Sequence, residues 1–492
     1  MIIRILKQLV ILLLPLALVL EAEAQSCDCY EELIFAKEKI ESNYAGFKDK
    51  VNETNRAAYE GFSDEIIKRA QSMEDRYACA ALIRKWLAYF KDGHIQLNHD
   101  RPNLGDLSED EIRTMFASTQ SEKKWSEKKI KKYLDKKELH PIEGIWQNTS
   151  GSYRTAIIRS SNPNSTSDFM GIVLKADSVY WMPGHIKVEV TETDGKLMAD
   201  YYYRDHHPEL VEVSLYGDEV VEFAGISQWK KQYPAVKESA GMTVDPDYFA
   251  KNNQPVVPSF SKLDNLTALL TLPSFGGQHA SVIDSLIYTH MTDITSSESL
   301  IIDLRGNPGG SDFCYAPIVP ILYTHPIFTA GVSIYASEDN IRSWEVLLED
   351  PKFSLVIKVR IRELVDKMKS NLNGYVEVPG EEVRHDTVYA NPQKIGIIVD
   401  KSCASSTEQF ILAAKQSDKV TVFGESTAGV LDYANMRSVD MKEIPYKLFY
   451  ATSKSNRLPE SPIDQIGISP DIELPYATDW IAEVKSRLKK LD

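Results

Sequence analysis

A short run of glycines follows a strongly apolar segment in the second half of the chain. The segment SLIIDLR at residues 299–305 is followed by Gly306-Asn-Pro-Gly-Gly310. The apolar run predicts a buried strand, and glycines at its carboxyl end let backbone N–H groups approach a substrate carbonyl closely. Such a turn can aim two N–H groups at one oxygen, as an oxyanion hole requires. Taken alone, the same residues are equally typical of a plain turn.

A candidate nucleophile follows a second apolar run, Ile395-Gly-Ile-Ile-Val-Asp400. The residues after it are KSCASSTE at 401–408, and an amphipathic helix comes next. A serine at the start of a helix lies beside unpaired N–H groups, where the helix dipole favours developing negative charge. Ser405 could therefore act as a nucleophile. The spacing Ser405-x-x-Glu408 also fits a capping box, which needs no catalytic role.

Ser426 offers a competing nucleophile of another class. The stretch VFGESTAG at residues 422–429 is close to the nucleophile elbow of an α/β-hydrolase esterase. In that fold the catalytic histidine follows the serine in the chain. The last histidine here is His385, so Ser426 has no base downstream and the esterase alternative is disfavoured.

The elements that must position these residues fall into three regions. From Tyr30 to about Leu134, apolar residues recur every three or four positions, which predicts a small helical domain. Its second long helix is expected to stop at Lys91-Asp92-Gly93, with Gly93 in the left-handed conformation. His94 then lies at a corner between a helix and a short strand.

The rest of the chain changes character twice. Short runs rich in branched and aromatic residues, separated by turns, predict an all-β module from about Pro141 to Phe223. The stretch NNQPVVPSF is the expected linker to the last region. After Ser259 strands and helices alternate, and continuous apolar runs indicate strands covered on both faces. The charged segment from about Ser337 to Glu382 is expected to be a helical insertion.

Composition and the first residues restrict the class of protein. The formal net charge of -15 is spread along the chain, which argues against nucleic acid as a partner. The opening residues, two basic positions and then an apolar run from Leu9 to Leu20, predict a cleaved signal peptide at residues 1–24 and hence a secreted or periplasmic protein. An uncleaved anchor is the alternative; after cleavage no stable membrane insertion is expected.

Five cysteines are too few for a disulfide scaffold in a chain of this length. Cys27, Cys29 and Cys79 could supply one bridge near the N-terminus. No cluster with metal-ligand spacing accompanies them, so neither a metal nor a cofactor is expected.

Four motifs in this order carry a family resemblance: LRGNPGG, CASSTEQF, VFGESTAG and IDQIGISPDIEL. Together they resemble the core of the C-terminal-processing (tail-specific) peptidases, family S41, and of their tricorn-like branch. The resemblance covers about Leu266 to Leu474, together with the Asp92-Gly93-His94 element. It implies that Ser405, three residues before Glu408, is the nucleophile.

The resemblance also implies which residues assist Ser405. The processing branch uses a lysine where this chain has Val430, so the Ser-Lys dyad is excluded. The tricorn-like branch uses a histidine and a carboxylate, which match His94 as general base and Asp464, where glutamate is usual. A serine of tricorn-type sites is replaced by Gly93. The oxyanion donors implied are the N–H groups of Gly309 or Gly310 and of Ser406.

The fold class that follows is a multidomain α+β chain. Residues 25–139 are expected to form the helical N-terminal domain that carries His94, residues 140–250 a β-rich accessory domain, and residues 251–492 an α/β peptidase core of the crotonase/ClpP-like type. No PDZ signature is visible in the β-rich region. The function implied is that of an exported serine endopeptidase acting on a peptide or protein. The alternative is an inactive relative that binds a peptide or another ligand.

Overall fold

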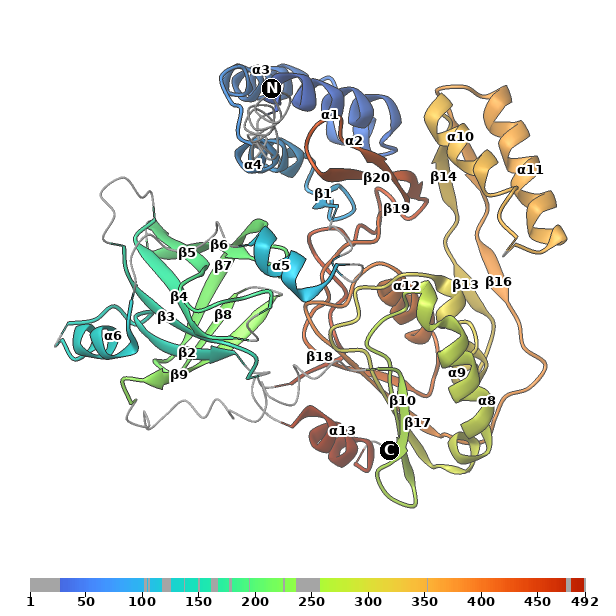
Figure 1. Cartoon of the computed structure of the whole chain (residues 1–492). Coiled ribbons are helices and arrows are strands. Elements are labelled where there is room, and N and C mark those ends of the chain that lie inside the picture. Colours follow the sequence, from blue (N-terminus) through green and yellow to red (C-terminus); the bar gives the residue numbers. More distant parts are fainter. Residues whose placement is uncertain are drawn as a thin grey trace, which may run out of the picture.

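A computed structural model describes residues 27–100, 104, 107–116, 125–136, 138–148, 151–160, 167–176, 179–193, 195–223, 226–235, 257–351, 353–474 and 479–490. The predicted signal peptide and most of the predicted linker lie outside these residues. Figure 1 shows the N-terminal helices at the top, a β-barrel at the left and an α/β part at the right. Within the described residues no helix is both long and apolar enough to cross a membrane.

A six-stranded sheet forms the centre of the α/β part, in the order β10-β11-β12-β17-β18-β21. Its neighbouring strands are parallel except for β10 and β11. The strands are β10 (Ser259–Lys262), β11 (Thr267–Thr271), β12 (Ser299–Asp303), β17 (Lys394–Val399), β18 (Val420–Gly424) and β21 (Ile472–Glu473). The predicted buried strands at SLIID and KIGIIV are confirmed.

Helices cover both faces of this sheet, because successive apolar side chains on its strands point to opposite sides. Ile302 packs with helices α8 (Ala280–Ser296), α9 (Val319–Leu322) and α12 (Ser406–Ala414). Ile301 packs on the other face, against helix α13 (Trp480–Leu488). Two short 3-10 turns, η4 (Gly277–His279) and η5 (Asp312–Cys314), lie beside the first group of helices.

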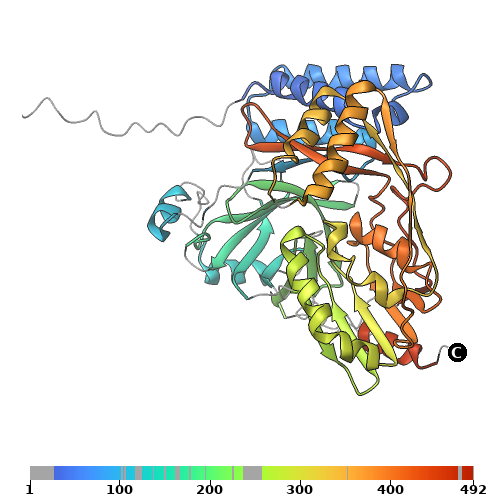
Figure 2. The same cartoon turned by 90° about the vertical axis from the view of Figure 1, so that its right-hand side faces the viewer.

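A second sheet joins distant parts of the chain. It runs β1-β20-β14-β15, with β19 paired to β20, and β1 of the N-terminal region is antiparallel to β20. The strands are β1 (Gln96–His99), β14 (Val332–Tyr335), β15 (Tyr375–Val378), β19 (Tyr433–Asp440) and β20 (Tyr446–Ser455). Figure 2 shows these strands beneath the N-terminal helices.

The predicted helical insertion at residues 337–382 is only partly helical. Helices α10 (Glu338–Val346) and α11 (Leu355–Ser370) form as expected, with a small apolar core of their own. The residues after them instead form β15 and β16 (Glu381–Val383), the latter paired with β13 (Ile327–Thr329). The alternation in Tyr375-Val-Glu-Val378 is that of a strand, and β14 supplies its partner.

The N-terminal helices share one core with the hairpin of β19 and β20. These elements are α1 (Cys29–Asn43), α2 (Phe47–Lys50), α3 (Arg56–Ala70), α4 (Arg76–Leu87) and η1 (Ala88–Phe90). Ile83 and Trp86 belong to the same buried cluster as Leu448 and Tyr450. The region that carries His94 is therefore packed onto the last third of the chain.

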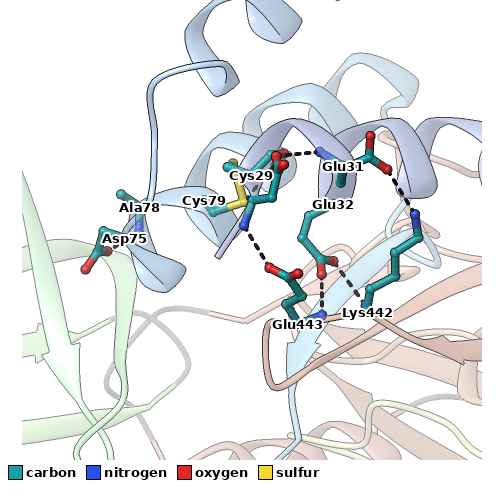
Figure 3. The surroundings of a disulfide bond; sticks show 9 residues. Cys29, Glu31, Glu32, Asp75, Ala78, Cys79, Lys442 and Glu443 are labelled. Carbon is teal, nitrogen blue, oxygen red and sulfur yellow. Dashed lines mark hydrogen bonds and ion pairs between the residues drawn. A yellow bond between two sulfur atoms is a disulfide. The ribbon is translucent and has the colours of Figure 1, made fainter. Parts of the chain in front are cut away.

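A disulfide and a buried carboxylate strengthen this packing (Figure 3). Cys29 and Cys79 form the single bridge expected near the N-terminus, while Cys27 is buried and free. The carboxylate of Glu32 accepts the backbone N–H groups of Lys442 and Glu443 from the loop between β19 and β20. Burial raises the pKa of Glu32.

The predicted all-β module is a closed eight-stranded barrel. Its strands are β2 (Gly144–Asn148), β3 (Arg154–Arg159), β4 (Phe169–Lys175), β5 (Ile186–Thr193), β6 (Lys196–Tyr202), β7 (Pro208–Tyr216), β8 (Val220–Phe223) and β9 (Ser227–Tyr233). Buried aromatic side chains, among them Trp146 and Trp229, fill its interior. Helix α6 (Glu127–Leu134) packs outside it through Ile130 and Leu134.

The loop between β6 and β7 docks the barrel against the N-terminal region. The ring of His206 stacks on Phe116, just after helix α5 (Glu109–Met115), with centroids 4.0 Å apart. Next to it, the ring of His207 stacks on His99 at the end of β1, at 4.1 Å. The barrel therefore contacts the same strand that follows His94.

Candidate active site

Ser405 lies between the loop after β17 and the first turn of α12. Its backbone is left-handed, with φ at +56°, a conformation that costs a non-glycine residue about 1–3 kcal/mol. Two acceptors hold it there: the Ser405 N–H donates to the carbonyl of Val430 at 3.0 Å and to Oε2 of Glu408 at 3.1 Å.

The carboxylate of Glu408 accepts four hydrogen bonds that hold this loop in place. Its side chain is fully buried. One carboxylate oxygen accepts from the Thr427 hydroxyl and from the Gly429 N–H, and the other from the N–H groups of Ser405 and Val430. With both oxygens engaged, Glu408 caps the helix and fixes the turn after β18, which leaves it no free group for the reaction.

His94 meets Ser405 across 311 residues of sequence. Nε2 of its imidazole lies 3.1 Å from the Ser405 Oγ. The side chain is 4 % exposed, and burial lowers the pKa of the imidazole, which is raised in turn by Asp464 and the backbone of Tyr433. A neutral imidazole at this distance can accept the proton of the serine hydroxyl.

The corner before His94 differs from the prediction in one detail. The left-handed residue that ends η1 is Lys91, with φ at +48°, and Gly93 does not have a positive φ. Gly93 is small for a steric reason: a Cβ there would lie 2.6 Å from Cγ2 of Val430. Val430 therefore fills the space that a serine at position 93 would need.

The negative charge of Asp464 raises the pKa of the His94 imidazole, although no hydrogen bond joins the two side chains. The Oδ1 of Asp464 accepts the N–H groups of Leu431 and Asp432, each at 2.8 Å. Its Oδ2 and the Nδ1 of His94 are both buried and have no hydrogen-bond partner among the described residues. Burial raises the pKa of Asp464 to about 6. The three predicted residues Ser405, His94 and Asp464 thus share one site.

The glycine turn abuts Ser405. A Cβ on Gly309 would lie 2.5 Å from the Ala404 carbonyl and 2.9 Å from the Ser405 Cβ. The N–H of Gly309 donates to Oδ1 of Asn307 at 2.9 Å, so it is already engaged. The backbone N–H groups of Gly310 and Ser406 donate to no acceptor within the described parts of the chain.

Asn307 has a structural function that the sequence analysis did not assign. Its side chain is fully buried. Besides the Gly309 N–H, its amide oxygen accepts the N–H of Phe275 at 3.2 Å, and its amide nitrogen donates to the carbonyl of Leu272 at 2.9 Å. The only hint in the sequence was an asparagine inside a glycine-rich turn, because such side chains often bond to nearby backbone.

A cavity of about 910 Å³ opens in front of these groups. His94, Ser405, Ser406 and Gly310 lie in its wall. The remaining lining is mostly apolar and includes Phe313, Tyr315, Ala316, Val319, Ile327, Val332, Ala413, Leu431 and Met436. The carboxylates of Asp312 and Glu381 also face it. The arrangement offers a nucleophile, a base and two backbone donors to a ligand in this cavity.

One group of side chains within the described residues has the donor types of a metal site. Donor atoms of His99, Asp205 and His207 lie within 4.8 Å of one another. The two imidazole rings are parallel, with an angle of 5° between their planes. Nδ1 of His99 and Nδ1 of His207 both approach the carboxylate of Asp205, so these contacts join the barrel to β1. The geometry is that of a docking contact.

Comparison with solved structures gives the fold over nearly the whole chain. A crystal structure of a CPAF mutant has a TM-score of 0.50 and 13% identity, covering 94% of this chain and 97% of its own. Mature CPAF gives 0.48 with 14% identity, covering 94% and 96%. The photosystem II D1 C-terminal processing protease gives 0.37 with 12% identity, covering 91% and 93%. No curated protein matches the sequence.

The sequence itself matches one family. Residues 266–474 fit the description of peptidase family S41. This stretch includes the glycine turn, Ser405, Glu408 and Asp464, and it begins and ends where the four motifs predict. His94 lies outside it and reaches the site through the fold. Residues 266–474 of the chain are therefore similar to peptidase family S41.

Proposed function

We propose that this chain is a serine peptidase that cleaves peptide bonds through an acyl-enzyme on Ser405. The observation that carries the proposal is the 3.1 Å contact between the Ser405 hydroxyl and the His94 imidazole at the wall of a cavity. A serine hydroxyl is a poor nucleophile unless a base takes its proton. A buried, neutral imidazole has the required basicity and position.

The reaction proceeds in two acyl-transfer steps. Ser405 Oγ attacks the peptide carbonyl while His94 takes the hydroxyl proton, and His94 then gives that proton to the leaving amine. Water hydrolyses the acyl-enzyme by the same exchange. Asp464 stabilises the imidazolium as a nearby negative charge. The oxyanion is held by the N–H groups of Gly310 and Ser406, because Asn307 occupies that of Gly309.

A fluorophosphonate probe tests the nucleophile directly. Labelling of the intact protein at Ser405, lost in Ser405→Ala and retained in Ser426→Ala, is the expected result. His94→Ala should lower kcat by about three to four orders of magnitude while the protein stays folded. An intact, folded protein that reacts with no probe at any pH would contradict the peptidase and favour the ligand-binding alternative.

The pH profile tests the base. Burial lowers the pKa of His94 from its ordinary value of about 6.5, so the acidic limb of kcat/KM should lie below that pH. Activity falls as the imidazole gains a proton. A rate that stays flat down to about pH 4 would count against a histidine base.

Export and the finer architecture belong to the same proposal. An exported protein meets an oxidising environment, and the Cys29–Cys79 bridge is consistent with one. Mass spectrometry of the protein from its native compartment should find Gln25 as the first residue.

The crotonase/ClpP-like arrangement of the core is supported by the parallel order β11-β12-β17-β18 with helices on both faces.

A further inference from the structure

Asp92, two residues before His94, has no function in the mechanism above, yet it holds the backbone of the histidine. Its side chain is 7 % exposed, and its Oδ1 accepts the backbone N–H of His94 at 2.8 Å. Its own carbonyl accepts the N–H of Ile95 at 3.1 Å. These two bonds close a tight turn of the kind that aspartate side chains stabilise. The direction in which His94 leaves the chain therefore depends on Asp92.

The other oxygen of Asp92 is buried, and the side chain of Tyr44 lowers the pKa of this carboxyl. Oδ2 of Asp92 and the hydroxyl of Tyr44 are both buried without hydrogen-bond geometry to a described partner. Burial raises the pKa of Asp92 to about 6. Among the surrounding charges, Lys50 lowers this pKa and Asp432 raises it.

Asp92 also acts on the proposed acid of the site. Its negative charge is the second cause, after burial, of the raised pKa of Asp464. Asp464 in turn raises the pKa of His94. Two buried carboxylates therefore influence each other, one bonded to the backbone of His94 and the other acting on its ring. Two like charges in such a place disfavour each other's ionisation.

We propose that Asp92 is a positioning residue for the peptidase reaction, and this proposal rests on the proposed function. Its carboxylate fixes the corner that aims His94 at Ser405, and its charge tunes the ionisation of the His94–Asp464 pair. The first effect needs only an oxygen that accepts the His94 N–H. The second needs the negative charge. Asparagine keeps the first and removes the second, and alanine removes both.

Steady-state kinetics of Asp92→Ala and Asp92→Asn separate the two effects, with the exposed Asp64→Asn as control. Displacement of the His94 base from its reactive position should lower the rate about 100-fold. Asp92→Ala should therefore lower kcat about 100-fold with KM within twofold, and Asp92→Asn should restore kcat to within about threefold. The positioning function is overturned if alanine leaves kcat unchanged, or if asparagine loses as much as alanine at equal thermal stability.

A titration of the His94 ring tests the charge without any hydrolysis. It uses protein with ¹³C-labelled histidine in the Ser405→Ala background, with His94→Ala to assign the resonance. Removing a nearby negative charge favours the form of the coupled His94–Asp464 pair that has lost a proton. The midpoint should move down by about one pH unit in Asp92→Asn and stay in place in Asp64→Asn. An unchanged midpoint overturns the electrostatic function. Failure of the peptidase itself appears separately, as wild-type protein that no fluorophosphonate labels.

Discussion

The backbone of Ser405 and the glycine turn are in close contact, so the position of the proposed nucleophile depends on a residue 96 positions earlier in the chain. Gly309 has φ at +90° and lies against the Ala404 carbonyl and the Ser405 side chain. The left-handed serine and the glycine occupy one small volume, and neither can move without the other. A side chain at position 309 must displace Ser405 or the turn.

Gly309→Ala should therefore lower kcat by about 100-fold, since a small displacement of the attacking oxygen is enough for such a loss. Gly306→Ala is a matched control in the same turn. Gly306 also has a positive φ, +75°, but a Cβ there would meet nothing within 4 Å. The control should lose about 1 kcal/mol of stability and keep its rate of fluorophosphonate labelling. Equal labelling rates in the two variants would contradict the dependence of Ser405 on Gly309.

For single residues, the sequence indicates which side chains could react but not which of them lie in contact. Ser405 and the glycine turn are recognisable because each follows an apolar strand. Nothing in the spacing relates Ser405 to His94 or to Asp464, and only the family resemblance selected those two. Asn307 and Asp92 were not singled out for a function, because a buried side chain bonded to backbone has no distinctive pattern in one sequence. The left-handed residue at this corner is Lys91 and not Gly93, and Val430 leaves no room for a Cβ at position 93.

The elements that carry His94 are held together by the Cys29–Cys79 bridge. The bridge joins α1 to α4, and α4 leads through η1 to the corner at Asp92. Its two cysteines are 50 residues apart. By chain entropy, closing a loop of this length stabilises the folded state by about 4 kcal/mol.

Replacing Cys29 and Cys79 together by serine should lower the free energy of unfolding by about 2–4 kcal/mol, measured by urea denaturation. Replacing the buried free Cys27 by serine is the control for the loss of a cysteine without loss of a bridge. Stability that is unchanged in the double variant would contradict a structural function for the bridge. Because the bridge lies outside the cavity, KM should change little.

Strands and helices with strong periodicity were predictable, and their partners were not. The runs at β12 and β17 read as buried strands from their apolar residues alone. The strands β15 and β16 are short and charged, so they resembled the helices beside them in the sequence. Closure of β2 to β9 into a barrel depends on pairing between β2 and β9, which no local pattern encodes.

The contact between the barrel and the N-terminal region depends on uncharged histidine. His206 is enclosed between the rings of Phe116 and Trp181, and burial lowers its pKa to about 4. Its Nε2 bonds to the carbonyl of Tyr180 at 2.7 Å. A folded-state pKa below the unfolded value of about 6.5 means that the folded form binds fewer protons between these two pH values. The contribution of His206 to the stability of the folded protein is complete above about pH 6.5 and is lost as the pH falls toward 4.

Urea denaturation at pH 7 and at pH 5 should show this loss. Wild-type protein should lose more unfolding free energy between the two pH values than His206→Phe, which keeps a ring in the stack but cannot take up a proton. The phenylalanine variant loses the bond to Tyr180 at both pH values. The test therefore compares, for each protein, the change in unfolding free energy between pH 7 and pH 5. Identical pH dependence of the two proteins would show that His206 does not titrate in the contact.

The core that α1 and α4 share with β20 has a consequence for how the molecule is made. Ribosomes deliver the chain from its first residue onward, and the helices before His94 emerge long before Leu448 and Tyr450, against which they pack. During synthesis, a growing polypeptide that already contains Ser405 still lacks the hairpin on which the His94 corner rests, and Asp464 comes later again. The proposed site is thereby completed only when nearly the entire polypeptide has been translated.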